Sequence, residues 1–153
     1  MKRYYLAYGS NLNVRQMKYR CPTAKIVGTA VIRDYELLYK GSKTGSYLTI
    51  EKKKGSVVPV AVWEVTPQDE HSLDIYEGYP NFYYKKNMKI RLSETRKMID
   101  AFVYIMHEER RLGVPTPAYV STCKFGYTIF GFDFKYLDEA YEKSLKEVAN
   151  DEN

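Results

Sequence analysis

Runs of β-branched and aromatic residues, bounded by Gly, Pro or short polar segments, recur from the N-terminus to about residue 106. They constrain the fold more than any other feature, because such side chains pack well on a pleated surface and favour strands. We predict strands over residues 2–8, 24–32, 35–40, 47–51, 57–65, 83–92 and 98–106. The segments 47–51 and 57–65 flank Lys52-Lys53-Lys54-Gly55, which predicts a hairpin that turns at these residues. Loops are predicted over residues 41–45 and 108–113.

Helix signals lie between these runs. Residues 13–20 predict a short helix that ends at Cys21-Pro22, because proline resists continuing a helix. A second helix is predicted after Thr66, a good N-cap that is followed by Pro67 at the first helical position. This helix is expected to end at Gly78.

Two further helices are predicted near the C-terminus. Residues 118–125 are a helix candidate, and a Gly- and aromatic-rich connection follows over residues 126–131. Asp133 can cap the last helix. The apolar face of that helix is expected to hold Leu137, Tyr141, Leu145 and Val148. Strands grouped in sequence, with hairpin connections and with helices between and after them, favour an α+β fold.

The length and composition fit one compact domain. A chain of 153 residues with 44% hydrophobic content can bury most of its apolar surface in a single core. We assign residues 1–149 to this domain and residues 150–153 to a frayed tail. The first residues lack the apolar core of a secretory signal, and no stretch approaches the roughly 18 apolar residues of a membrane span. We therefore expect a cytoplasmic protein with no membrane partner.

The basic charge has two readings. A net charge of +5 and 16 tyrosines could serve nucleic-acid binding, in which case the affinity would fall steeply with salt. We favour a basic surface that keeps the protein soluble, because the Lys52–Lys54 cluster is joined to no nucleic-acid motif and most tyrosines alternate with aliphatic residues in predicted strands. No nucleic-acid partner is expected.

The cysteines and histidines do not suggest a metal site. They occur singly, as Cys21, Cys123, His71 and His107, without a CxxC or HExxH pattern. We expect free buried thiols and no metal. The histidines are expected to be exposed or to fill the core.

The segment Tyr8-Gly9-Ser10-Asn11-Leu12 follows a predicted strand and precedes a predicted helix. Such a turn can direct successive backbone N–H groups at an anion such as a carboxylate. The simpler reading is an ordinary turn in which Asn11 or Asn13 caps the helix. Ser10 would act as a nucleophile only with an adjacent base, and none lies close in sequence.

Glu77 lies in the last turn of the helix that follows Thr66, a helix expected to turn Leu73 and Tyr76 toward the core. An acid at a helix C-terminus is unfavourable with the helix dipole, so another constraint can account for it. A surface glutamate in a frayed turn is the alternative.

Taken together, the Tyr8–Leu12 segment and Leu73-Asp74-Ile75-Tyr76-Glu77-Gly78-Tyr79-Pro80, roughly 65 residues later, carry a family resemblance. The chain resembles the gamma-glutamylcyclotransferase superfamily, in particular its AIG2-like branch. Nearly the whole chain shares the resemblance, through Gly28, Tyr35 and residues 48–50, 62–66, 103–106 and 117–131. It implies a mixed, barrel-like β-sheet with flanking helices.

The resemblance also implies a reaction. A γ-glutamyl compound would be converted into 5-oxoproline and a free amine, with Glu77 as general base and the Tyr8–Leu12 loop binding the glutamyl end. The tyrosine that family members carry after a proline turn corresponds to Tyr119 in Pro117-Ala118-Tyr119. No cofactor is needed, because the α-amine of the substrate is itself the nucleophile.

A base of this kind needs a raised pKa, so we predict that Glu77 lies in a pocket walled by tyrosines and apolar groups. The candidate wall residues are Tyr8, Tyr79, Tyr83 and Tyr119, whose hydroxyls could bind carboxylate or carbonyl oxygens. The alternative function is a non-catalytic domain of the same fold that binds a small metabolite. The sequence does not specify the leaving amine or the oligomeric state.

Overall fold

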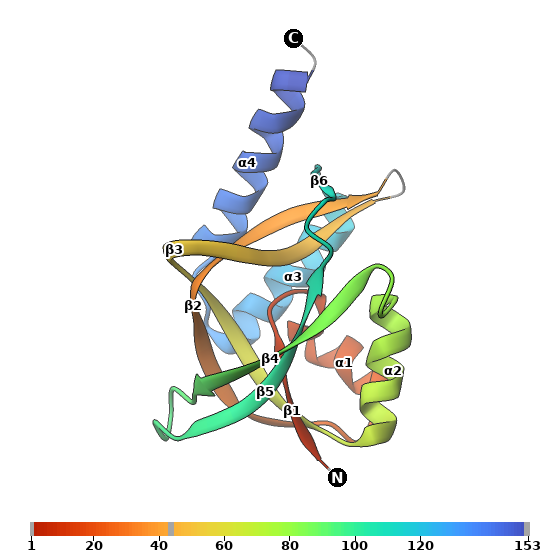
Figure 1. The fold of residues 1–153 in the computed structure, drawn as a ribbon, viewed down its shortest axis with the longest axis vertical. Coiled ribbons are helices and arrows are strands. Elements are labelled where there is room, and N and C mark those ends of the chain that lie inside the picture. Colours follow the sequence, from red (N-terminus) through yellow and green to blue (C-terminus); the bar gives the residue numbers. More distant parts are fainter. Residues whose placement is uncertain (1, 43–44, 152–153) are drawn as a thin grey trace.

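A curled β-sheet forms the body of the protein (Figure 1). The computed structural model describes residues 2–42 and 45–151. Within them, six strands lie in the order β4-β5-β1-β3-β2-β6, and of the paired neighbours only β1 and β5 run parallel. The strands are β1 (Arg3–Ala7), β2 (Lys25–Ser42), β3 (Gly45–Val65), β4 (Tyr83–Arg91), β5 (Met98–Met106) and β6 (Arg111–Leu112). This curled, half-barrel sheet with flanking helices confirms the predicted α+β fold class.

The longest contact in the sheet is the antiparallel pair β2–β3, which runs from Lys25↔Glu64 to Ser42↔Gly45. The predicted hairpin between residues 47–51 and 57–65 is wrong, because both segments belong to β3 and pair with β2. The predicted strands 24–32 and 35–40 likewise merge into β2. Lys43 and Thr44, in the predicted loop 41–45, lie outside the described residues.

A bend in the β2–β3 pair lies where a hairpin turn was predicted. Asp34 in β2 has φ 63° and Gly55 in β3 has φ 89°, and the Asp34 carboxylate accepts a hydrogen bond of 3.0 Å from the Gly55 N–H. The register of β2 on β3 shifts at this point, between Arg33 and Tyr35. Turn-forming residues therefore curve two continuous strands here instead of ending them.

The helices are η1 (Ser10–Leu12, a 3-10 turn), α1 (Val14–Arg20), α2 (Pro67–Glu77), α3 (Pro117–Phe130) and α4 (Lys135–Asp151). The predicted start of α2 is confirmed. Thr66 accepts a hydrogen bond from the Asp69 N–H, and Asp69 accepts one in return from the Thr66 N–H. Gly78 ends the helix in the left-handed conformation, with φ 64°. These local signals make Glu77 the last residue of α2.

Several helix details differ from the prediction. The helix predicted to end at Phe125 continues as α3 through the segment that was predicted to be a connection. On α4, Leu145 is exposed and Ser144 is buried in its place. Tyr76 is 43% exposed and does not belong to the core. The predicted charged loop 108–113 contains the short strand β6.

Gly126 explains why α3 continues. A Cβ atom at this position would lie 2.5 Å from Leu12 Cβ and 2.9 Å from the Asn13 backbone nitrogen. The glycine therefore lets α3 approach η1 closely. Its role at this position is to allow the helices to pack, and it does not end α3. This contact supports the turn that follows β1.

The two cysteines agree with the prediction. Cys21 and Cys123 are free, buried thiols, as expected. Among the described residues, no helix is long and apolar enough to cross a membrane. The helix α4 includes Asn150 and Asp151, whereas residues 152 and 153 of the predicted tail lie outside the described part of the chain.

We predict that Gly126→Ala destabilises the protein. In an exposed helix interior the same change would stabilise the helix by about 1 kcal/mol, because alanine has the higher helix propensity. The added methyl would overlap Leu12, and overpacking of this kind costs about 1–3 kcal/mol. Urea unfolding of Gly126→Ala beside Ser121→Ala, an exposed change on the same helix, measures the effect. A Gly126→Ala protein more stable than the native one would contradict the packing role.

Candidate active site

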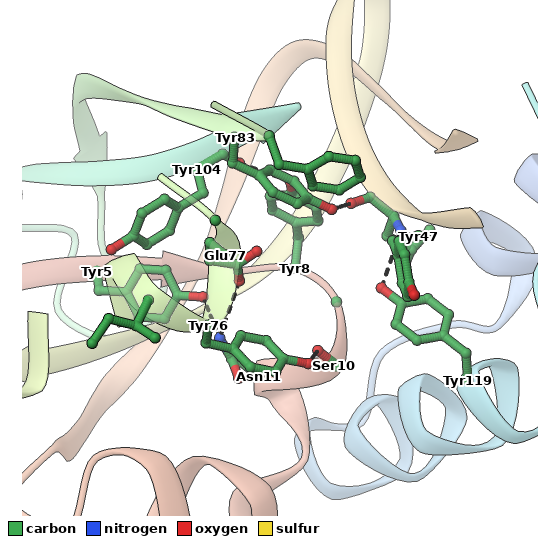
Figure 2. A pocket seen from close by; sticks show the side chains of 15 residues that line it. Tyr5, Tyr8, Ser10, Asn11, Tyr47, Tyr76, Glu77, Tyr83, Tyr104 and Tyr119 are labelled. Carbon is green, nitrogen blue, oxygen red and sulfur yellow. Dashed lines mark hydrogen bonds between the residues drawn. The ribbon is translucent and has the colours of Figure 1, made fainter. Parts of the chain in front are cut away.

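A cavity of about 410 Å³ opens where β1 runs into η1 (Figure 2). Residues from β1, η1, β3, α2, β4, β5 and α3 surround it. The lining comprises Tyr5, Tyr8, Gly9, Ser10, Asn11, Tyr47, Leu48, Ile75, Tyr76, Glu77, Gly78, Phe82, Tyr83, Tyr104 and Tyr119. Glu77 is the one carboxyl group among these lining residues, and seven of the fifteen are tyrosines. The structure thus brings Glu77 and the Tyr8–Asn11 turn to one cavity.

Glu77 has an unusual electrostatic environment. Glu77 is half-buried and lines the cavity, and burial of its carboxyl raises its pKa to about 8, while the Arg20 guanidinium acts in the opposite direction. The Asn11 Nδ2 lies 3.5 Å from Glu77 Oε1 and also donates a hydrogen bond of 2.8 Å to the Tyr5 hydroxyl. The predicted tyrosine-walled pocket around Glu77 is therefore present.

The turn after β1 holds main-chain amides at the cavity edge. The Leu12 and Asn13 N–H groups donate to the Gly9 and Ser10 carbonyls, each at 3.0 Å. No hydrogen bond among the described residues uses the N–H groups of Gly9, Ser10 and Asn11. The Ser10 hydroxyl is 2.9 Å from the Tyr76 hydroxyl, which joins this turn to α2. These three amides are the donors that the turn offers to a ligand.

Three of the tyrosine hydroxyls form hydrogen bonds with the backbone. Tyr8 donates to the Tyr104 carbonyl at 2.7 Å, and Tyr83 donates to the Leu48 carbonyl at 2.8 Å. The Tyr119 hydroxyl accepts from the Leu48 N–H at 3.0 Å. Burial, and next to it the charge of Glu77, raise the pKa of Tyr8 well above its usual value. The rings therefore stand in fixed positions and stay protonated.

Not every predicted site residue lines the cavity. Leu12 is fully buried against Gly126, so its place is in the packing below the turn. Tyr79 is 41% exposed and is not part of the lining. The lining also includes three tyrosines that are not among the predicted site residues, Tyr5, Tyr47 and Tyr104. Alternation along each strand places them on the cavity side, but the sequence alone does not tell which face that is.

The histidines lie elsewhere. His71 is exposed on α2, and His107 Nε2 contacts the Pro80 carbonyl at 2.7 Å. Neither lines the cavity that holds Ser10, so neither stands as its base. The described residues contain no group of three His, Cys, Asp or Glu side chains placed to hold a metal ion.

The chain is an α+β protein with a curled sheet, in which Glu77 and the turn after β1 line one tyrosine-rich cavity. The chain belongs to the family described as "Gamma-glutamyl cyclotransferase, AIG2-like", which it matches over residues 5–121.

Similar proteins carry related descriptions. The chain is 28% identical over 143 residues to human gamma-glutamylcyclotransferase, with 88% of this chain and 75% of the human protein covered. A solved structure of a gamma-glutamyl cyclotransferase has a TM-score of 0.81 at 26% identity, with 92% of this chain and 86% of that chain covered. A mouse AIG2-like protein at 20% identity has a TM-score of 0.58 over 78% of this chain and 82% of that chain, which shows a shared fold.

We predict that Glu77→Gln raises the thermal stability of the protein at high pH. The Glu77 pKa is about 4.3 when unfolded and about 8 when folded, so its favourable contribution is lost as pH rises between these values. The melting temperature of the variant minus that of the native protein should therefore grow from pH 5 to pH 8 and then level off. The matched control is Glu109→Gln, at an exposed glutamate between β5 and β6. A difference that is constant over this range would show that the carboxyl is not buried.

Proposed function

We propose that the protein is a cyclotransferase that releases 5-oxoproline and a free amine from a γ-glutamyl compound, with Glu77 as general base. The observation that carries this proposal is the buried Glu77 carboxyl, which shares one cavity with the free amides of Gly9, Ser10 and Asn11. Membership in the gamma-glutamyl cyclotransferase family supports the same reaction.

The glutamyl end of the substrate is proposed to bind at the turn after β1. Its α-carboxylate accepts hydrogen bonds from the N–H groups of residues 9–11, which are free to bind an anion. Tyr83 and Tyr119 line the same cavity and are proposed to contact the rest of the glutamyl group (Figure 2). This arrangement leaves the α-ammonium group of the substrate on the side of Glu77.

The proposed steps balance without another reactant. The Glu77 carboxylate takes one proton from the α-ammonium, and the resulting amine attacks the γ-carbonyl carbon to form the five-membered ring. The bond from that carbon to the leaving nitrogen then breaks. Glu77 returns its proton to the leaving nitrogen as this bond breaks, and its carboxylate then takes the second proton that the ring nitrogen must lose. That proton passes to the released amine, so that 5-oxoproline and an ammonium product are formed and the enzyme regains its initial state.

The raised pKa suits the first step. Moving a proton from an α-ammonium with a pKa of about 8 to an ordinary glutamate is uphill by about 5 kcal/mol. With the Glu77 pKa also near 8, the transfer is close to balanced, and the protonated acid is still strong enough to protonate the leaving nitrogen. Burial in the aromatic cavity is the cause of this match.

The cavity also favours ring closure. The nucleophile and the carbonyl belong to one molecule, and a well-oriented intramolecular attack has an effective molarity of about 10⁵–10⁸ M. A cavity of about 410 Å³ with fixed tyrosine walls restricts an extended glutamyl chain to folded conformations. We therefore propose that substrate orientation accounts for much of the rate enhancement and that Glu77 carries out the proton transfers.

We predict that Glu77→Gln lowers the release of 5-oxoproline by about 10²–10⁴-fold, because glutamine cannot accept the ammonium proton. The assay measures 5-oxoproline from a panel of γ-glutamyl compounds with different leaving amines. Glu109→Gln should retain native activity. Equal turnover by Glu77→Gln and the native protein would refute the assigned base, and saturable binding of the panel without any product would favour a metabolite-binding domain.

We also predict an acid limb of kcat/KM with a midpoint near pH 8. Below this pH Glu77 is protonated in the free enzyme and cannot act as a base, so kcat/KM should fall about tenfold per pH unit. A pH profile from pH 5 to pH 9 with one γ-glutamyl substrate measures it. An acid limb near pH 4.5 would show that Glu77 titrates like an exposed glutamate.

A further inference from the structure

Arg20, the last residue of α1, lies behind the cavity and is not part of its lining. Its Nη1 donates a hydrogen bond of 2.5 Å to Asn11 Oδ1, and its Nη2 donates one of 2.8 Å to Gln16 Oε1. The guanidinium also lies over the Tyr76 ring, 3.5 Å from the ring centroid. One side chain therefore contacts both the turn after β1 and the last turn of α2, the two segments that the Ser10–Tyr76 hydrogen bond joins beside the cavity.

These contacts fix which way the Asn11 amide points. A guanidinium has donors only, so the amide atom that faces Arg20 must be the acceptor Oδ1. The opposite atom, Nδ2, then carries its two hydrogens toward the Tyr5 hydroxyl at 2.8 Å and Glu77 Oε1 at 3.5 Å. A flipped amide would present an oxygen to the carboxylate. Arg20 thus determines that Glu77 faces a hydrogen-bond donor.

The other groups around Glu77 are neutral or already paired. The phenols that face it are Tyr5 on β1, Tyr8 in the turn after β1, Tyr76 on α2, Tyr83 on β4, Tyr104 on β5 and Tyr119 on α3. Burial raises the pKa of each, so they carry no charge near neutral pH. Lys85 on β4 lies against the Tyr104 ring but is paired with Glu70 and Asp74. Arg20 is the cation that lowers the pKa of Glu77, against the larger effect of burial.

We propose that Arg20 is a positioning residue for the reaction: it orients the Asn11 amide and, through that amide and its own charge, favours the ionised Glu77 carboxylate that accepts the substrate proton. Arg20 touches neither the substrate nor the reacting atoms. The catalytic role of Arg20 rests on the proposed function, whereas its effect on the ionisation of Glu77 can be measured in the protein without substrate.

The test is the titration of Glu77 without substrate. In protein labelled with ¹³C at the glutamate carboxyl carbon, the Glu77 signal is assigned by its loss in Glu77→Gln. The midpoint of the Glu77 titration should move upward in Arg20→Gln, because the variant removes a positive charge and no longer fixes the orientation of the Asn11 amide. Arg15→Gln is the matched control, since Arg15 lies on the same helix and stacks on the Phe125 ring away from the cavity. Its midpoint should equal the native one.

A second variant separates positioning from folding. Arg20→Lys keeps the charge but lacks the planar fork of donors, so its Glu77 midpoint should fall between those of the native protein and Arg20→Gln. The kcat/KM of Arg20→Gln at pH 7 should drop about tenfold for each pH unit of that shift and recover as the pH rises. A residue that only supports the fold would lower the melting temperature without moving the titration.

The two proposals fail in different ways. An unchanged or lower Glu77 midpoint in folded Arg20→Gln or Arg20→Lys would overturn the role of Arg20, whether or not the protein makes 5-oxoproline. Upward shifts in both variants support that role. The absence of 5-oxoproline with every substrate would instead refute the proposed function, while the titration would still measure the effect of Arg20 on Glu77.

Discussion

The antiparallel pairing of β2 with β3 is the contact on which the rest of the structure depends. It extends over both strands, and its bend at Asp34 and Gly55 curls the sheet (Figure 1). The strand β1 pairs with β3 and β5 pairs with β1, so the curvature of the ribbon sets the position of both. The tyrosines of these strands thereby converge on one cavity.

Within this frame, Glu77 occupies a locally unfavourable place. A carboxylate at a helix C-terminus opposes the helix dipole, and its burial among aromatic rings costs further free energy. Neither cost is offset by a direct ion pair among the described residues, since Arg20 bonds to Asn11 and not to Glu77. Such a group in a cavity is typical of a functional site, where a perturbed pKa has a use. The fold keeps the acid there through the Thr66 cap and the left-handed Gly78.

The sequence predicts the local part of this arrangement well and the long-range part poorly. Caps and glycines act within a few residues, so the limits of α2 and the place of Glu77 follow from Thr66, Pro67 and Gly78. Gly55 and Gly126 do not end their strand and helix as predicted, because their roles depend on the distant partners Asp34 and Leu12. The contact of Arg20 with Asn11 and Tyr76 carries no local signal at all. A single domain over residues 1–149, a cytoplasmic location and the absence of nucleic-acid binding stay predictions.

The most direct test of the account is a crystal structure of Glu77→Gln with an unreacted γ-glutamyl compound. The account predicts that the α-amino nitrogen of the ligand lies within about 3 Å of the residue 77 side chain. It also predicts that the ligand carboxylate lies on the amides of residues 9–11 and that the γ-carbonyl carbon is within reach of the amine. A ligand with its amine turned away from residue 77, or an acyl group attached to Ser10, would contradict it.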